Sequence, residues 1–338
     1  MISRVADHCF WFGRYLERSE STARLLQATR TLALDGTLPF TQCWEPLIIV
    51  SGQFPEFKER FGLDALGDGE AVQGYMTWDD QTPVSLKSCL GAARENARII
   101  RDVLSLDTWE ATNELYHFLE RDPAHTLYDQ NRDEFYLSVR RGTQLALGLV
   151  RSTMLHDQPM NFLWLGVMLE RVGQTARILD MHHHIMEIEG DEHDIMQTAL
   201  WLSLLRACSG GEAFMRKHQG RISPQALVSF LLKELTFPRS LAYCLKSAHR
   251  IIGDIWNNDP TAEPGAALIR LGHLGEYLKE SSATTDSAHI HELLTYVVDQ
   301  TALVCSDIGK EIQGLSSDAS LDVQAQSSLD VQAQSSTN

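Results

Sequence analysis

Residues 11–26 read WFGRYLERSESTARLL, and residues 164–179 repeat this stretch as WLGVMLERVGQTARIL. Nine of the sixteen positions are identical, where two unrelated segments of this length would share about one. A second match follows at nearly the same distance, because six residues of 83–93 recur in 238–248. The two matches are 153 and 155 residues apart, and they indicate that one unit occurs twice in this chain of 338 residues.

Both repeated segments have the apolar spacing of helices. In the first, apolar and small residues recur along one face from Phe12 to Leu26, with the period of an amphipathic helix. The second opens with Pro and then Ser in each copy, as suits a first helical turn. Further stretches with helical periodicity are 134–155, 194–217, 222–235, 266–280 and 288–313.

Strand signals are scarce, so the sequence predicts an all-α fold. The short β-branched run from Leu47 to Val50 follows Trp44 and Pro46, and it fits a buried helix equally well. Stretches rich in Gly, Asp and Pro predict loops at 62–70, 121–133, 187–194 and 257–265.

The repeat and the helical periodicity together predict an internally duplicated helical bundle. We expect two pseudo-symmetric halves packed together, residues 1–155 and 156–315. Residues 316–338 contain SLDVQAQS twice and no aromatic residue, so we expect a disordered low-complexity tail there.

The composition disfavours several classes of protein. With 29 basic and 45 acidic residues the formal net charge is −16, which argues against binding to nucleic acid or to an anionic membrane surface. No apolar run approaches the roughly 18 residues of a membrane span, and the first residues lack a signal-peptide core. The six Cys form no CxxC pair and lie among apolar residues, as free thiols do in a reducing compartment. We therefore expect a cytoplasmic protein.

A line of polar residues lies beside the apolar stripe of each repeated helix. Glu17 and Glu170 each follow a Gly by one turn, which lets a neighbouring backbone or a ligand approach the carboxylate closely. Arg24 and Arg177 lie two turns farther along the same faces. Two interpretations stay open: a buried Glu–Arg lock between two helices, or a site with catalytic Glu residues and anion-binding Arg residues. Presence in both halves favours architecture.

A row of arginines occurs in the first half only. Arg94, Arg98 and Arg101 have the i, i+4, i+7 spacing of one helix face, and Glu95 and Asn96 lie between them. The second half has His and Gly at the positions of Arg94 and Arg98, which is how a functional feature is expected to behave after a duplication. These residues are candidates for binding phosphate or a substrate carboxylate. The alternative is intramolecular salt bridging to Glu17, Glu20 or Glu170.

No metal or cofactor site is evident. His183 and Glu187 have the i, i+4 spacing that helical metal ligands use, but they lie in a crowded acidic stretch that fits a solvated loop better. The chain contains no GxxxxGK[ST], GxGxxG, GxSxG or HExxH motif. Nothing specifies a nucleophile.

Three blocks of the sequence carry a family resemblance: RVAD at 4–7 with WFGRYLER at 11–18, ARENAR at 93–98 with WE at 109–110 and Asn113, and LWLGVMLER at 163–171. Together they resemble the bacterial alpha-E domain family. The resemblance covers about residues 1–313 and ends before the repetitive tail. It implies an all-helical domain of unknown function, whose genes typically lie beside those of circularly permuted ATP-grasp proteins and transglutaminase-like cysteine peptidases.

The resemblance also implies an ATP-grasp enzyme as partner. ATP-grasp enzymes join a carboxylate to an amine through an acyl phosphate, and a protein that holds one of these anionic groups has use for an Arg row. The leading hypothesis is a helical accessory protein of an ATP-grasp amide ligase. The Arg row would bind an anionic group, and Glu17 and Glu170 would orient these arginines or accept an amine proton. One alternative is an enzyme in its own right, with Glu17 as general base in an Arg-lined helical pocket. The other is a purely structural helical module.

Overall fold

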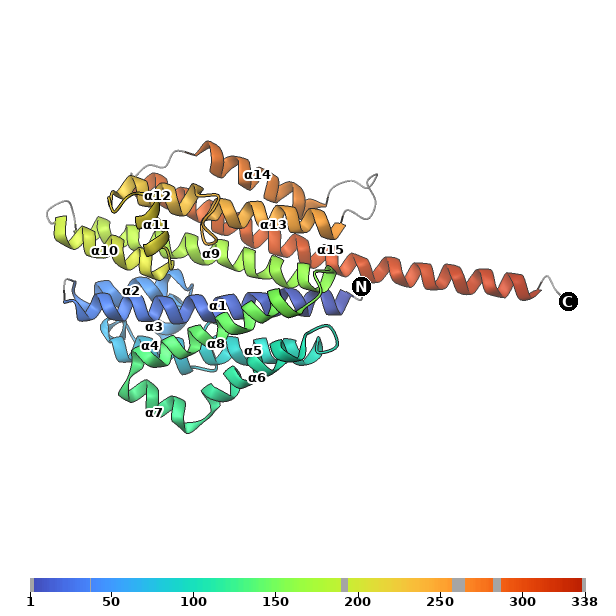
Figure 1. Cartoon of the computed structure of the whole chain (residues 1–338), viewed down its shortest axis with the longest axis horizontal. Coiled ribbons are helices and arrows are strands. Elements are labelled where there is room, and N and C mark those ends of the chain that lie inside the picture. Colours follow the sequence, from blue (N-terminus) through green and yellow to red (C-terminus); the bar gives the residue numbers. More distant parts are fainter. Residues whose placement is uncertain (1–2, 37, 190–193, 257–264, 282–286, 336–338) are drawn as a thin grey trace.

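The computed structural model describes residues 3–36, 38–189, 194–256, 265–281 and 287–335, apart from the side chains of 183–189, 194–197, 287, 313 and 315–335. Every regular element within these residues is helical (Figure 1), which confirms the all-α fold. The elements are α1 (Ser3–Leu34), α2 (Phe40–Val50), α3 (Phe54–Phe61), the 3-10 helix η1 (Asp64–Gly67), α4 (Gly69–Trp78), α5 (Leu86–Ile99), α6 (Leu106–Glu120), α7 (Asp122–Gln130), α8 (Arg132–Thr153), α9 (Gln158–Glu189), α10 (Asp194–Ala207), α11 (Gly211–Lys217), α12 (Pro224–Lys233), α13 (Leu241–Trp256), α14 (Ala266–Glu280) and α15 (Ser287–Ser335).

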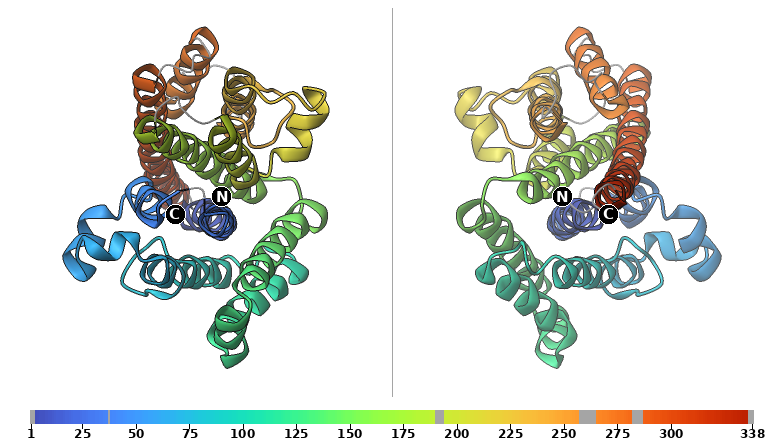
Figure 2. Two further views of the ribbon diagram at one scale, coloured as in Figure 1. Left: turned by 90° about the vertical axis from the view of Figure 1, so that its left-hand side faces the viewer. Right: turned by 90° about the vertical axis from the view of Figure 1, so that its right-hand side faces the viewer.

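The two helices that contain the first repeated segment, α1 and α9, lie side by side in the middle of the molecule (Figures 1 and 2). Each is 32 residues long. In the view of Figure 1, most helices of the first half lie below this pair and those of the second half above it. Buried apolar residues of both halves form one continuous core. The duplication itself stays our interpretation of the sequence.

Two glycines let α1 and α9 approach until their backbones touch. A Cβ built on Gly13 would lie 2.1 Å from the carbonyl O of Leu163, and one built on Gly166 would lie 2.1 Å from the carbonyl O of Phe10. Both pairs of equivalent positions are 153 residues apart, so the contact is reciprocal. Only Gly permits this approach. It brings the Glu that follows each Gly by one turn against the opposite helix.

The second repeated segment begins α5 and α13 in the same way. Ser85 Oγ accepts a hydrogen bond from Ser88 N at 3.1 Å, and Ser240 Oγ accepts one from Tyr243 N at 3.1 Å. These are N-cap bonds, which satisfy a free N–H of the first turn. The Cys four residues after each Ser donates to the carbonyl of the preceding Pro, at 3.4 and 3.3 Å. The helices therefore start where Pro and Ser predicted, but Ser is the N-cap and Pro lies before the first turn rather than in it.

Some predicted boundaries were wrong. Residues 121–133 contain α7 rather than a loop, because Pro123 lies in the first turn of a helix, where its fixed φ is favourable. The predicted helix 194–217 is interrupted at Ser209, whose φ is +50°, and it forms α10 and α11. The ambiguous run from Leu47 is helical and belongs to α2.

Two further expectations concern the predicted loops at 187–194 and 257–265 and the C-terminal tail. The predicted loops at 187–194 and 257–265 include residues 190–193 and 257–264, which lie outside the described residues. α15 continues past the bundle to Ser335 (Figure 1), so residues 316–335 have a helical backbone where we expected disorder. The expectation for this tail in solution stays a prediction.

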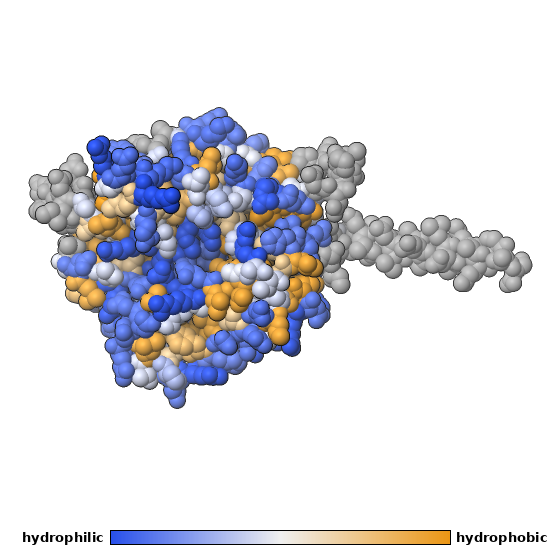
Figure 3. Space-filling model, viewed as in Figure 1, coloured by the Kyte–Doolittle hydropathy of each residue, from blue (hydrophilic) through white to orange (hydrophobic). Residues whose placement is uncertain are grey.

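The surface of the molecule carries both polar and apolar residues. On the face shown in Figure 3, hydrophilic and hydrophobic residues are interspersed. Among the described helices, none is both long and apolar enough to cross a membrane.

Candidate functional site

Glu170 of α9 is enclosed by side chains of α1 and has no exposed side-chain surface. Arg18 binds it through two bonds, Nε to Oε1 at 2.7 Å and Nη2 to Oε2 at 2.9 Å. Arg14 Nε donates to Oε2 at 3.0 Å, and Gln174 Nε2 donates to Oε1 at 3.0 Å. Four hydrogen bonds and two guanidinium charges therefore offset the burial of this carboxylate.

Glu17 of α1 has the reciprocal arrangement with α9. Its side chain is fully buried, and Arg171 binds it through Nε at 3.0 Å and Nη2 at 2.6 Å. Arg239, which precedes α13, donates from Nη1 to Glu17 Oε1 at 2.6 Å. Each Glu is thus paired with the Arg that follows the other Glu in the sequence. This is the geometry of a packing lock between the two central helices.

Arg24 belongs to a second buried ion-pair group on α1. Its guanidinium donates to Glu20, to Ser21 Oγ at 3.2 Å and to the carbonyl O of Ala207. Glu20 also accepts from Arg239 Nη2 at 2.8 Å. Burial alone would raise the pKa of Glu20, but Arg239 and Arg24 lower it from 4.5 to about 2. Arg24 is therefore fully occupied by the protein itself.

Arg177 of α9 differs from Arg24, its counterpart in the repeat. It makes no hydrogen bond or ion pair with another described residue. Instead it lines a cavity of about 230 Å³ together with Arg14 and Arg18. Gly173 leaves room for it, since a Cβ there would lie 3.1 Å from Arg177 Nη2. We call this cavity the arginine cleft; its other lining residues are Thr22, Leu25, Leu47, Val50, Ser51, Met76, Val84, Gln174 and Ile178.

The charges around the arginine cleft do not balance. Burial alone would raise the pKa of Glu170, but Arg18 and Arg14 hold it well below its usual range, so this carboxylate stays ionised. Burial lowers the pKa of Arg177; the attraction of Glu170 opposes this effect, and the repulsion of Arg18 and Arg14 adds to it. Three guanidiniums face one carboxylate, which leaves two positive charges uncompensated. A bound anion would relieve this repulsion.

Sequence reasoning selected Glu170 and Arg177 for this region but missed Arg14 and Arg18. A usable signal was present, because the second copy has Val167 where the first has Arg14. The Arg94 row was selected on the same kind of difference, an arginine that the first copy has and the second lacks.

The Arg94 row lies on the surface, between α5 and α6. Arg94 Nε donates to Asn113 Oδ1 at 3.0 Å, and its Nη1 donates to Glu95 Oε1 at 3.0 Å. Its guanidinium also stacks over Tyr116, 4.7 Å from the ring centroid. Arg94 is therefore engaged by neighbouring side chains rather than by the carboxylates of α1 or α9.

The other members of the row are spread over the end of α5. Arg98 is 60% exposed and donates to Glu95 Oε2 at 2.9 Å. Arg101 lies past the last helical residue and stacks over Trp109, 5.5 Å from the ring centroid. Asn96 faces the start of α1, where its Oδ1 lies 2.7 Å from His8 Nδ1.

The salt bridges that we considered for this row are therefore absent from the described structure. Arg94, Arg98 and Arg101 do not pair with Glu17, Glu20 or Glu170, and Glu17 and Glu170 do not orient them. The physical reason is the apolar stripe of α5, which faces α1 and turns the arginines toward α6 and solvent; the stripe consists of Leu86, Cys89, Leu90, Ala93 and Ala97.

The side chains of the two candidate metal ligands are not described by the structure. His183 and Glu187 lie near the end of α9, where only the backbone is described. Among the residues that the structure does describe, no group of three or more His, Cys, Asp or Glu could hold a metal ion.

One known protein family is described by a Glu-Arg motif. A family described as a predicted alpha-helical domain with a conserved ER motif matches residues 1–313. The chain belongs to the alpha-E family. In this alpha-E protein, Glu17-Arg18 and Glu170-Arg171 are the Glu-Arg pairs that join α1 to α9.

The alpha-E chain is also similar to larger proteins of mycobacteria. Uncharacterised proteins of Mycobacterium bovis and of two strains of Mycobacterium tuberculosis are each 25% identical to it over 314 residues. The match covers 86% of this chain but 35% of each relative, so the chain spans about a third of the length of the curated relatives it matches. No solved structure matches the chain.

Proposed function

We propose that this alpha-E protein is a helical accessory protein that binds an anionic group, a carboxylate or a phosphate, in the arginine cleft. The observation that carries the proposal is Arg177, a guanidinium without a hydrogen-bonding partner among the described residues, which lines a cavity beside two further arginines. Arg177 is half-buried, and a half-buried guanidinium without a hydrogen-bonding partner is unfavourable unless an anion compensates its charge.

The lining of the arginine cleft fits such a ligand. The planar guanidinium binds carboxylate and phosphate oxygens through two parallel bonds, so Arg177 can take one edge of the anion. Thr22, Ser51 and Gln174 also line the cavity and can supply further hydrogen bonds. Apolar walls from α2 and α4 exclude part of the surrounding water, which strengthens the attraction of the uncompensated charge.

The geometry gives less support to a catalytic role for Glu17 or Glu170. A general base needs a pKa near the pH at which it works. Burial would raise the pKa of Glu17, but Arg171 and Arg239 hold it below its usual value, and Glu170 is held low in the same manner. Both carboxylates already accept several hydrogen bonds, so they are suited to holding arginines in place.

We further propose that the partner is an ATP-grasp amide ligase in the cytoplasm, and that the anion belongs to its substrate or product. The support is the family resemblance and the length of the mycobacterial relatives. About two thirds of each relative lies outside the matched region, so a module of this kind is joined there to other sequence. A transglutaminase-like peptidase is the second partner that the resemblance suggests.

Titration with inorganic phosphate and with acetate, followed by calorimetry, tests the anion site. Arg177→Gln should abolish the binding. It should leave the free energy of unfolding in anion-free buffer unchanged or higher, because the loss of the attraction to Glu170 is offset by removal of the desolvation of Arg177 and of its repulsion from Arg18 and Arg14. Arg221→Gln is the matched control, since Arg221 is an exposed arginine away from the cleft. Equal binding by wild type and the Arg177 variant would refute the site, and absence of binding by both would favour a purely structural module.

Co-purification tests the partner separately. The ATP-grasp protein from the same bacterium should be retained by the tagged alpha-E protein in a pull-down. A monomer that does not retain it would count against the accessory role but leave the anion site standing.

A further inference from the structure

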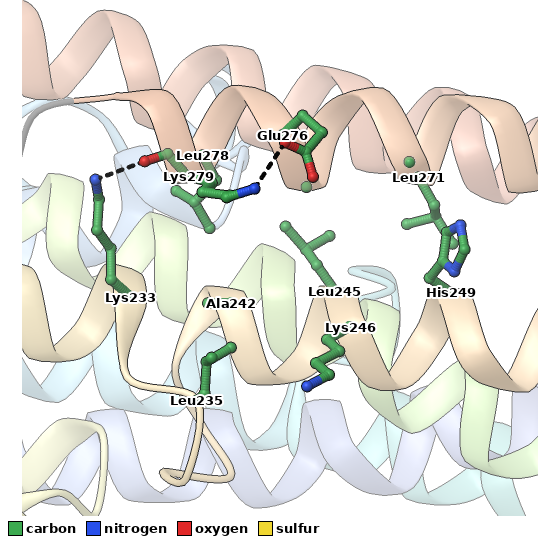
Figure 4. A pocket seen from close by; sticks show the side chains of 12 residues that line it. Lys233, Leu235, Ala242, Leu245, Lys246, His249, Leu271, Glu276, Leu278 and Lys279 are labelled. Atoms are coloured by element: carbon green, nitrogen blue, oxygen red, sulfur yellow. Dashed lines mark hydrogen bonds and ion pairs between the residues drawn. The ribbon is translucent and has the colours of Figure 1, made fainter.

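An apolar groove runs between α13 and α14. It shares no lining residue with the arginine cleft. Its volume is about 440 Å³, within the range of sites that bind small organic molecules. Leu245 points from α13 toward α14 across the groove (Figure 4). The apolar lining residues are Leu235, Ala242, Leu245, Leu271 and Leu278.

Basic side chains surround this apolar surface. Lys233, Lys246 and Lys279 are three of the seven lysines in the chain, and all three line the groove. Lys279 Nζ lies 3.2 Å from Glu276 Oε2, and Lys233 Nζ donates to the carbonyl O of Lys279 at 3.1 Å (Figure 4). Lys246 is exposed and forms no hydrogen bond or ion pair with the described residues. In a protein with a net charge of −16, this gathering of ammonium groups is a local exception.

The groove is open because two glycines of α14 face it. A Cβ built on Gly275 would meet no atom within 4 Å, and one built on Gly272 would lie 3.7 Å from His249 Nε2. The space beside α14 can therefore accept added atoms without displacing the protein.

The corresponding place in the first half is filled. The buried residues Thr108, Thr112, Leu115 and Leu119 of α6 have the same spacing as Ala267, Leu271, Leu274 and Leu278 of α14, at a constant offset of 159 residues.

With this alignment, Asn113 and Tyr116 take the places of Gly272 and Gly275. Asn113 and Tyr116 are the residues that engage Arg94, through a hydrogen bond at 3.0 Å and a ring contact at 4.7 Å. The groove thus exists where two side chains of the first half have no counterpart.

We propose that the α13–α14 groove binds a small amphipathic anion, with an apolar chain against the leucines and a carboxylate or phosphate head at Lys246. The apolar lining supplies the affinity through burial of the chain. The lysines supply the preference for an anion over a neutral or cationic compound of the same shape. The proposal does not depend on the arginine cleft, so each can fail without the other.

Calorimetric titration of the full chain with dodecanoate below its micelle concentration tests the proposal. Dodecanoate should bind more tightly than dodecanol, and dodecyltrimethylammonium should bind least. Gly275→Tyr, which places in the groove the side chain that the first half carries, should weaken dodecanoate binding more than about tenfold. Lys246→Gln should weaken it about two- to fivefold, the range of an exposed ion pair. Lys58→Gln is the matched control, because Lys58 is exposed on α3, and it should have no effect.

Three outcomes would overturn the proposal. The first is absence of dodecanoate binding by wild type. The second is equal binding of dodecanoate and dodecyltrimethylammonium. The third is unchanged dodecanoate binding in Lys246→Glu, an exposed change that stays informative even where Gly275→Tyr fails to fold. A protein partner whose capture is lost in Gly275→Tyr, together with no dodecanoate binding, would assign the groove to a partner helix instead.

Discussion

Replacing Gly166 by Ala tests whether the close crossing of α1 and α9 holds the protein together. The new Cβ would lie 2.1 Å from the carbonyl O of Phe10 and 3.0 Å from its carbonyl carbon. Real Cβ contacts essentially never fall below 3.0 Å, so the two backbones must separate by about 1 Å. The obstacle is backbone within a helix, which cannot rotate away as a side chain can.

The expected cost follows from two opposing effects. Overpacking of a filled core costs about 1–3 kcal/mol, and we expect the upper end because two long helices must move together. Ala in place of Gly inside a helix recovers about 1 kcal/mol through its higher helix propensity. Separation of the helices also lengthens the Arg18–Glu170 bonds, which are now 2.7 and 2.9 Å. The free energy of unfolding should therefore fall by about 2–3 kcal/mol.

Gly148→Ala in α8 provides the matched control. A Cβ built on Gly148 would meet no atom within 4 Å, so this variant should be more stable than wild type by about 0.5–1 kcal/mol. Urea unfolding followed by circular dichroism measures both variants against wild type. Gly13→Ala should behave like Gly166→Ala, because its Cβ would meet the carbonyl O of Leu163 at the same 2.1 Å. If Gly166→Ala proves as stable as Gly148→Ala, the account of the crossing is wrong.

Other changes probe the charges. Glu170→Ala leaves three guanidiniums without a carboxylate and should cost about 3–5 kcal/mol in urea unfolding, part of which added phosphate should restore. A loss smaller than about 1 kcal/mol would contradict a buried lock. Arg98→Ala should change the free energy of unfolding by less than about 0.5 kcal/mol, because this arginine has one exposed ion pair; a large loss in chemical denaturation would show an unseen structural role. The stability that ionised Glu20 contributes should be complete above pH 4.5 and be lost as the pH falls to about 2, since the pKa of Glu20 is depressed in the folded protein. Acid titration at fixed urea concentration checks this, and a free energy of unfolding that rises across that window would contradict it.

The helices and the central crossing were predictable from the sequence, because they depend on local spacing. The bounds of α14 agree with the predicted 266–280, and α5 and α13 begin within three residues of the Pro that was expected to open them. The Gly-Glu spacing on each repeated helix also indicated a close approach. These features depend on residues a few positions apart, where helical periodicity decides the outcome.

The partners of the charged residues were not predictable in the same way. Glu17 bonds to Arg239, which is 222 residues away in the sequence, and no local spacing specifies that contact. In the sequence, the Arg94 row has the spacing of one helix face. In the structure, α5 ends before Arg101, and Arg94 lies over the ring of Tyr116. Which face of a helix meets which neighbour depends on the packing of the whole bundle.

The crossed Glu–Arg bonds between α1 and α9 have the form of an isologous interface, in which one surface meets an equivalent copy of itself about a two-fold axis. Such an interface is ordinarily found between identical subunits. Here both copies of the patch belong to one polypeptide, so the symmetry mate is always present and its concentration does not depend on dilution. The two patches can also differ in sequence, as Arg14 and Val167 do at equivalent positions. A symmetric homodimer is denied that freedom, because any change to one subunit is made to both.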